Sequence, residues 1–258
     1  MQGLGNDYVY LDCTKETWPD LPELARRMSR RHFGVGSDGL ICILPSDAAD
    51  FKMRIFNADG SEGEMCGNGI RCVGKYVYDH GLTRSLRLDV ETLSGVKRLS
   101  LTTAGGAVSA VTVDMGRPSW QPPRDITVRG TTYTALPVSM GNPHAVVFAD
   151  DLESLDLRAI GPGFETHPGF PGGVNAEFVR AVDPSHLRMR VWERGSGETL
   201  ACGTGACAAL TAAAVTGLCG RDAVVELPGG KLDLRWENDD HIYMTGPAVT
   251  VFEGDWPE

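Results

Sequence analysis

The chain of 258 residues contains an internal repeat, and this repeat limits the folds that it can adopt. Short landmarks recur along the chain at a constant offset of 136 residues. The matching pairs are Gly5-Asn6 with Gly141-Asn142, Asp20-Leu21 with Asp156-Leu157, Glu62 with Glu198, Cys66-Gly67 with Cys202-Gly203, and Gly81-Leu82 with Gly217-Leu218. Each half has an ordinary size for a domain. We therefore expect two homologous halves, 1–112 and 113–248; whether 249–258 crosses back to complete the first half stays open.

Each half is expected to contain short strands and two helices. The strand candidates are β-branched or alternating runs bounded by Gly, Pro or Asp, at 108–115, 134–138, 145–148, 187–192 and 223–227. A first helix is expected to begin at Asp20, whose carboxylate can cap it, and to stop at Gly34. The second helix of each half starts at a cysteine, covering 66–80 and 202–216, and the latter is apolar almost all round. The pattern predicts an α+β (mixed α/β) chain in which strands wrap a buried helix in each half.

Composition and charge narrow the class of protein. Lys plus Arg number 24 and Asp plus Glu 34, a formal net charge of −10, which disfavours nucleic acid and anionic membrane as partners. The sequence has no apolar run of about 18 residues, the length that a membrane helix needs, and its start does not resemble an export signal. We therefore expect a cytoplasmic protein whose seven cysteines are reduced thiols.

Two motif-like patterns are interpreted as structural. The stretch GVGSDG at 34–39 fits GxGxxG, but a basic helix precedes it and an apolar strand follows, the reverse of a dinucleotide site. Within each cysteine helix, Cys66 with Cys72 and Cys202 with Cys207 point to different faces, so neither pair can chelate one metal ion, and no metal is expected. Five cysteines are interpreted as small buried core residues. These are Cys13, Cys42, Cys72, Cys207 and Cys219.

Cys66 and Cys202 differ from the other five because each begins a helix after an acidic, Gly-rich loop and is followed by Gly-x-Gly. The start of a helix carries unpaired N–H groups and the positive end of the dipole, which stabilise a thiolate and can bind an anion. Glycines after the cysteine let a ligand approach the backbone closely. A capped helix with an incidental cysteine is the alternative, and recurrence in both halves weakens it.

If the homologous halves point these helix starts at one shared cleft, two thiols face a ligand from opposite sides. Two opposed acid/base groups suit a reaction that removes a proton from one face of a carbon and returns one to the other face, as in racemisation or epimerisation. Two helix N-termini would hold an α-carboxylate and stabilise the charge that develops beside it. This scheme requires no cofactor.

Four segments resemble the diaminopimelate epimerase family. They are GLGNDYV at 3–9, FNADGSEGEMCGNGIRC at 56–72, SMGNPHAV at 139–146 and VWERGSGETLACGTGACA at 191–208. The resemblance implies a cofactor-independent isomerase that interconverts LL- and meso-2,6-diaminopimelate for lysine and peptidoglycan precursor biosynthesis. It implies two pseudo-symmetric domains, each a mostly antiparallel β-barrel-like sheet around a central helix, with the active site between them. The small-molecule substrate is the implied partner, and a homodimer stays open.

The resemblance also assigns roles to matching positions. Cys66 and Cys202 match the base and acid pair, and His144 matches a histidine beside one thiol that can tune or relay its proton. Glu193 matches a group that accepts from the reacting ammonium, and Arg194 matches one that also reaches the distal carboxylate. The implied backbone donors to the reacting carboxylate are Gly67, Asn68, Gly203 and Thr204. The implied side chains at the distal end of the substrate or along the cleft are Asn6, Asn57, Asn142 and Asn175.

The sequence differs from some members of the family at one position, and three alternative functions remain. Gly39, the repeat equivalent of Asn175, stands where some family members have Gln. The sister activities on the same fold are a proline racemase or hydroxyproline epimerase and a phenazine-pathway isomerase. A different class is a thiol redox switch, in which Cys66 and Cys202 form a reversible disulfide.

Overall fold

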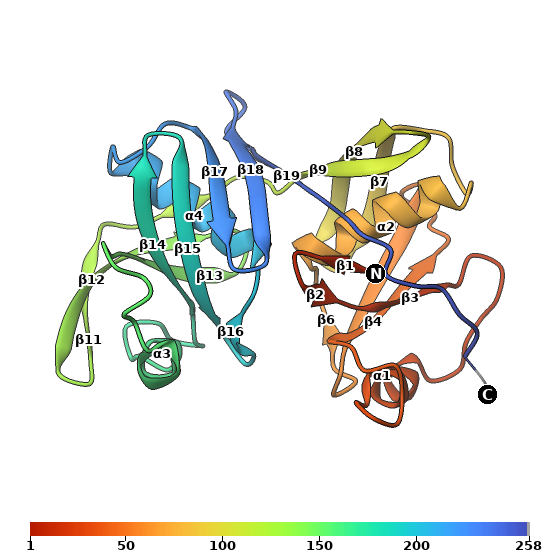
Figure 1. Ribbon diagram of the computed structural model, residues 1–258, viewed down its shortest axis with the longest axis horizontal. Helices are drawn as coiled ribbons and strands as arrows, with labels where there is room; N and C mark the ends of the chain where they lie inside the picture. The colour runs from red at the N-terminus through yellow and green to blue at the C-terminus, as the bar shows by residue number, and fades with distance from the viewer. Residues whose placement is uncertain (257–258) are drawn as a thin grey trace. The chain divides into compact units, whose positions relative to one another are not determined.

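The computed structural model describes residues 1–256, and the chain divides into two compact units. One unit consists of Met1–Val113 together with the chain from Gly246 onward, and the other of Asp114–Thr245. Figure 1 colours both along the chain. In the part of the chain described, no helix has the length and apolar character to cross a membrane.

The first unit contains a mostly antiparallel sheet and two helices, α1 (Leu21–Ser29) and α2 (Gly67–Asp79). Its strands are β1 (Gln2–Gly3), β2 (Asn6–Asp7), β3 (Val9–Asp12), β4 (Gly39–Leu44), β5 (Phe51–Asn57), β6 (Glu62–Gly63), β7 (Arg87–Thr92), β8 (Gly95–Ala104) and β9 (Ala107–Asp114). Strand β3 pairs with β4 in parallel, and β5 with β7 in parallel. The pairs β4–β5, β5–β6, β7–β8 and β8–β9 are antiparallel.

The second unit repeats this plan around α3 (Leu157–Glu165) and α4 (Gly203–Val215). Its strands are β10 (Ser119–Trp120), β11 (Arg124–Val128), β12 (Thr131–Ser139), β13 (Pro143–Phe148), β14 (Asn175–Asp183), β15 (His186–Glu193), β16 (Gly197–Thr199), β17 (Asp222–Leu227), β18 (Gly230–Trp236) and β19 (Ile242–Gly246). Strand β13 pairs with β14 in parallel, and β15 with β17 in parallel. The other pairings within the unit are antiparallel, for example β14–β15 and β17–β18.

Strand register and helix bounds both keep the offset of the sequence repeat. Leu40 lies between Val9 and Phe56 in the first unit, and Ala176 takes the same place in the second, 136 residues later. Helices α3 and α4 begin and end 136 residues after α1 and α2. The predicted strands and cysteine helices are confirmed, with bounds that differ by at most a few residues.

Helix α1 is shorter than predicted, and this corrects the sequence interpretation. Asp20 caps the helix as expected, accepting from the backbone N–H of Glu23 at 3.1 Å. The helix ends at Ser29, not at Gly34, because Arg30 takes an extended backbone with ψ of 110°. The chain then turns back, and the N–H of Gly36 donates to the carbonyl of Met28 at 2.9 Å. Arg30 and Arg31 therefore lie beyond the helix, while Arg26 and Arg27 are in its last turn.

Both cysteine helices are largely buried within their units. Helix α4 contacts β12, β13, β14, β15, β17 and β18, and nearly all of its residues up to Ala213 are buried, as its apolar sequence predicts. Figure 1 shows it among these strands. Four of the predicted core cysteines are buried: Cys13, Cys42, Cys72 and Cys207. The prediction is wrong for Cys219, which follows the end of α4 and is partly exposed.

The C-terminal segment returns to the first unit. Val249 and Gln2 form an antiparallel bridge, with N–H to carbonyl distances of 2.9 and 3.0 Å in the two directions. The guanidinium of Arg71, which is fully buried, donates from Nε to the carbonyl of Pro247 at 3.1 Å. The segment after β19 is thus fixed to both the first strand and the start of α2.

Candidate functional site

Cys66 and Cys202 take the same position at the starts of α2 and α4. Each is the N-cap, one residue before the helix, with φ of −128° and ψ of 116° or 113°. The sulfur of Cys66 accepts from the N–H of Gly69 at 3.3 Å, and that of Cys202 accepts from the N–H of Gly205 at the same distance. A backbone N–H that donates to sulfur stabilises a thiolate more than a neutral thiol.

The glycines three residues after each cysteine are required by packing within the protein. A Cβ at Gly69 would lie 2.5 Å from Cδ1 of Ile41, and one at Gly205 would lie 2.8 Å from Oε1 of Glu177. At these two positions, a side chain of the same unit lies close to the backbone of the first turn of the helix.

The first unit brings Asn6 next to the Cys66 thiol. The thiol donates to Oδ1 of Asn6 at 3.2 Å, while Nδ2 of Asn6 donates to the carboxylate of Asp38 at 2.7 Å. Asp38 was missed by the sequence reasoning, and it fixes the orientation of this amide. Asn57 ends β5, and its Nδ2 donates to the hydroxyl of Ser61 at 3.0 Å.

Asn68 and Gly67 form the first turn of α2, where a buried arginine holds them. Nη2 of Arg71 donates to Oδ1 of Asn68 at 3.0 Å, and Nη1 donates to the carbonyl of Gly67 at 3.1 Å. The side chain of Asn68 is buried with Arg71. This contact holds the Asn68 amide oxygen against Arg71, one turn further along the helix.

In the second unit, four hydrogen-bonded side chains follow one another away from Cys202. Its sulfur lies 3.6 Å from Oγ1 of Thr204, which accepts from Nδ2 of Asn142 at 3.3 Å. Oδ1 of Asn142 lies 3.1 Å from Nε2 of His144. Nδ1 of His144 lies 2.6 Å from Oε1 of Glu177, and both of these residues are fully buried.

Glu193, Arg194 and Asn175 meet at the end of β15. Asn175 starts β14, and its Oδ1 accepts from the backbone N–H of Arg194 at 2.8 Å. The hydroxyl of Thr199 donates to Oε1 of Glu193. Glu165, another residue that sequence reasoning missed, accepts from the N–H of Gly195 at 2.9 Å and so fixes the turn that carries Arg194.

Burial raises the pKa of two acidic groups near the start of α4, Cys202 and Glu177. Burial first, and then the charges of Glu193 and Glu177, raise the pKa of the Cys202 thiol well above its ordinary value, against the donors on Thr204 and Gly205. Burial likewise raises the pKa of Glu177, and His144 opposes this shift. Cys202 therefore rests as a neutral thiol near neutral pH.

Gly39 has no room for a side chain. A Cβ there would lie 2.1 Å from the carbonyl oxygen of Phe56 and 2.8 Å from the ring of Tyr8. The place that Asn175 fills in the second unit is thus occupied in the first by backbone and by the Tyr8 ring.

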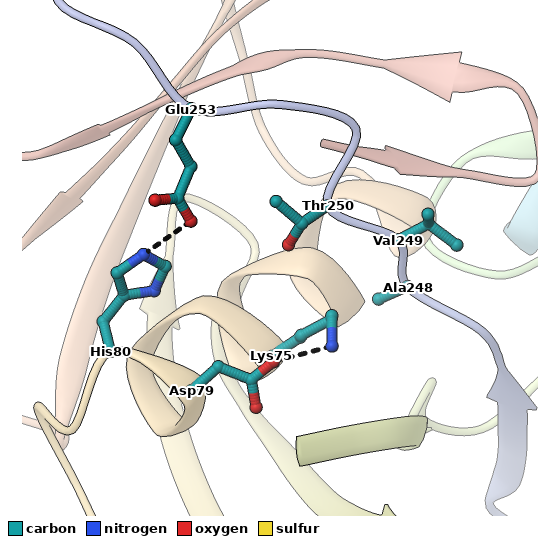
Figure 2. A pocket seen from close by; sticks show the side chains of 7 residues that line it. All are labelled: Lys75, Asp79, His80, Ala248, Val249, Thr250 and Glu253. Carbon is teal, nitrogen blue, oxygen red and sulfur yellow. Dashed lines mark hydrogen bonds and ion pairs between the residues drawn. The ribbon is translucent and has the colours of Figure 1, made fainter.

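Two surface pockets lie within the units. One, of about 450 Å³, lies between the last turn of α2 and the returning C-terminal segment, at the opposite end of the helix from Cys66 (Figure 2). The other, of about 410 Å³, includes Glu165 and Arg194. Among residues 1–256, no group of three or more His, Cys, Asp or Glu side chains is arranged to hold a metal ion.

Comparison with known proteins agrees with the motifs. The family model described as diaminopimelate epimerase matches residues 1–121 and 136–251. A diaminopimelate epimerase of Acetivibrio thermocellus is 52% identical, over 99% of this chain and 96% of the relative. One of Methanococcus maripaludis is 53% identical, over 99% of this chain and 97% of the relative.

Solved structures with low sequence identity share the fold. A Bacillus anthracis phenazine biosynthesis protein of the PhzF family is 17% identical with a TM-score of 0.71, covering 96% of this chain and 92% of that one. A hydroxyproline epimerase from Agrobacterium vitis is 16% identical with a TM-score of 0.67, covering 95% and 87%. The predicted mixed α/β, epimerase-like fold is confirmed. On sequence and motifs together, the chain belongs to the diaminopimelate epimerase family.

Proposed function

We propose that this protein interconverts LL- and meso-2,6-diaminopimelate without a cofactor, using Cys66 and Cys202 as the two acid/base groups. The observation that carries the proposal is the identical N-cap geometry of these two cysteines, each with its sulfur 3.3 Å from a helix N–H. The chain's family supports the substrate, because curated relatives about half identical over nearly their full length carry this activity in their names.

In each direction one sulfur is a thiolate and the other a thiol. The thiolate takes the proton from the α-carbon and becomes S–H, and the electron pair is left on the carbon and its carboxylate. The second thiol then gives its proton to the opposite face and becomes a thiolate, so the total number of protons is unchanged. The raised pKa of Cys202 supports its acting first as the donor.

The helix starts supply the electrostatic stabilisation. The N–H groups of Gly67-Asn68 and Gly203-Thr204 would hold the reacting carboxylate while negative charge develops at the α-carbon. Glu193 would accept from the reacting ammonium and Arg194 would reach the distal carboxylate. The cleft asparagines, Asn6, Asn57, Asn142 and Asn175, would bind the rest of the substrate.

We further propose that the protein acts in the cytoplasm, as a step toward lysine and peptidoglycan precursors, and a homodimer is the assembly we would test. The rival activities make different predictions for the same assay. A proline racemase exchanges the α-proton of proline, and a redox switch exchanges that of neither amino acid.

Deuterium exchange tests the function directly. LL-diaminopimelate incubated in D₂O with reductant and no added cofactor should gain deuterium at the α-carbon and yield the meso isomer, followed by NMR and chiral chromatography. Cys66→Ala and Cys202→Ala should each lower the rate by about a thousandfold, because each removes one proton-transfer group. Cys219→Ala, a partly exposed cysteine outside the site, is the matched control. No exchange by the wild type would overturn the proposal, and an active Cys66 or Cys202 variant would refute the two-base assignment.

A further inference from the structure

A continuous hydrogen-bonded chain of side chains joins a buried carboxylate to the Cys202 thiol. It runs from Glu177 on β14 through His144 on β13 to Asn142, Thr204 and the sulfur, with links of 2.6, 3.1, 3.3 and 3.6 Å. Its far end also returns to the start of α4, because Oε1 of Glu177 lies against Gly205, whose N–H donates to the same sulfur.

The first unit shows which side chain can pack at the position that Glu177 takes in the second unit. Ile41 is the repeat equivalent of Glu177, and its Cδ1 packs on Gly69 as Oε1 of Glu177 packs on Gly205. An isoleucine therefore fills the same space in a homologous unit. A carboxyl group that is fully buried, with an Oε2 atom that has no hydrogen-bond partner among residues 1–256, needs a reason other than packing.

The direction of each hydrogen bond follows from the groups that can only donate or only accept. Nδ2 of Asn142 can only donate, and it donates to Oγ1 of Thr204, which leaves Oδ1 of Asn142 to accept from His144. Nε2 of His144 must then carry a hydrogen. The hydroxyl of Thr204, which accepts from Asn142, can donate its own hydrogen to the sulfur of Cys202, 3.6 Å away.

We propose that Glu177 is a positioning residue, which through His144, Asn142 and Thr204 keeps a hydrogen-bond donor directed at the Cys202 sulfur. One proton lies between Glu177 and Nδ1 of His144. The other ring hydrogen is thereby kept on Nε2, the nitrogen that faces Asn142. The donor from Thr204 joins that from Gly205 in stabilising the thiolate that forms when Cys202 gives up its proton. The S–H of the neutral thiol is then directed away from the chain, toward the carbon that it protonates.

The titratable groups around this sulfur are Glu193 on β15, Glu177 on β14 and His144 on β13. Glu193 and Glu177 both oppose ionisation of the Cys202 thiol. Hydrogen-bond donors directed at its sulfur act in the other direction, because they favour the thiolate. The inference rests on the proposed acid/base role of Cys202, but the orientation of the chain can be measured without turnover.

Nitrogen-15 NMR of histidine-labelled protein tests the orientation. The sequence has six histidines, and His144 is assigned by comparison with His144→Gln. We expect Nε2 of His144 to carry a hydrogen in the wild type, whether or not Nδ1 is also protonated. A bare Nε2 would reverse every link in the chain and overturn the proposal, regardless of whether the protein proves to be an epimerase.

Two variants separate positioning from packing. Glu177→Ile, which copies the first unit, should release the His144 ring into a mixture of tautomers and lower kcat about tenfold with KM nearly unchanged. Glu177→Gln should restore both, because its amide N–H can donate to Nδ1 as a protonated carboxyl does. Thr211→Val removes another buried polar group of α4, bonded to the carbonyl of Cys207, and should change neither.

Two outcomes of the variant experiment would contradict the inference. If Glu177→Ile keeps the wild-type tautomer and kcat, the carboxylate has no positioning role. If Glu177→Gln loses as much kcat as Glu177→Ile, the hydrogen bond to Nδ1 is not what matters. Should Glu177→Ile fail to fold, the wild-type spectrum and Glu177→Gln still decide the question.

Discussion

At the scale of single residues, the Cys202 thiol links stability to pH. Its pKa is raised in the folded chain by burial and by Glu193, so the folded state holds this proton more tightly than the unfolded chain does. The resulting stability is complete below the ordinary thiol pKa of about 8.5 and is lost as pH rises above it.

Cys202→Ala should therefore make the protein less sensitive to alkali. Between about pH 8 and pH 10, the free energy of unfolding should fall less in this variant than in the wild type, because alanine has no proton to lose. Urea denaturation at several pH values measures the difference. Thr211→Val, which removes no titrating group, should keep the wild-type pH dependence; an equal fall in Cys202→Ala would show that this thiol does not contribute.

Sequence reasoning selected residues that repeat or belong to motifs, and it missed Asp38, Glu165 and Glu177, which have no identical residue at the equivalent position of the other half. Cys66 and Cys202 are visible because they recur and begin helices. Glu177 has Ile41 as its repeat equivalent, so the comparison of halves could not mark it. One signal was available in the sequence: apart from Asn175, Glu177 is the only polar residue in the strand segment 175–179. The structure buries this whole segment. The roles of the predicted site residues stay predictions.

At the scale of secondary-structure elements, the start of β4 depends on a glycine. A Cβ at Gly39 would overlap the carbonyl oxygen of Phe56 at 2.1 Å, in the strand paired with β4. Gly39→Ala should lower the free energy of unfolding by about 1–3 kcal/mol, because strand or ring must move. Gly254→Ala is the control, because a Cβ added there would meet no atom of the described residues beyond its chain neighbours within 4 Å. Chemical denaturation measures both, and equal stability of the two variants would contradict the clash.

Helices could be predicted where residues within the helix itself mark its start and end. The cysteine helices have caps, apolar faces and ends that the sequence marks, and their expected ranges, 66–80 and 202–216, include just the helix and its two caps. The end of α1 depends instead on a turn in which the N–H of Gly36 reaches back to Met28, a contact that local periodicity does not contain.

At the scale of the whole molecule, the first unit depends on both ends of the chain. Val249→Pro removes the N–H that donates to the carbonyl of Gln2 at 3.0 Å. Hydrogen exchange should become faster in peptides of β1 and α2 and stay unchanged in peptides of the second unit. Val251→Pro is the control, because Val251 lies outside the bridge and the residue is 61% exposed. Equal exchange in the two variants would show that the bridge does not stabilise the unit.

The return of the C-terminal segment affects the order of events during translation. Residues 1–113 are synthesised before the unit 114–245, yet the strand partner of Gln2 and the acceptor for Arg71 at Pro247 are synthesised after it. The unit 114–245 is continuous in sequence and can form its hydrogen bonds before residues 247–249 are added. The first unit, with the start of α2, can therefore complete its hydrogen bonds only after the second unit has been synthesised.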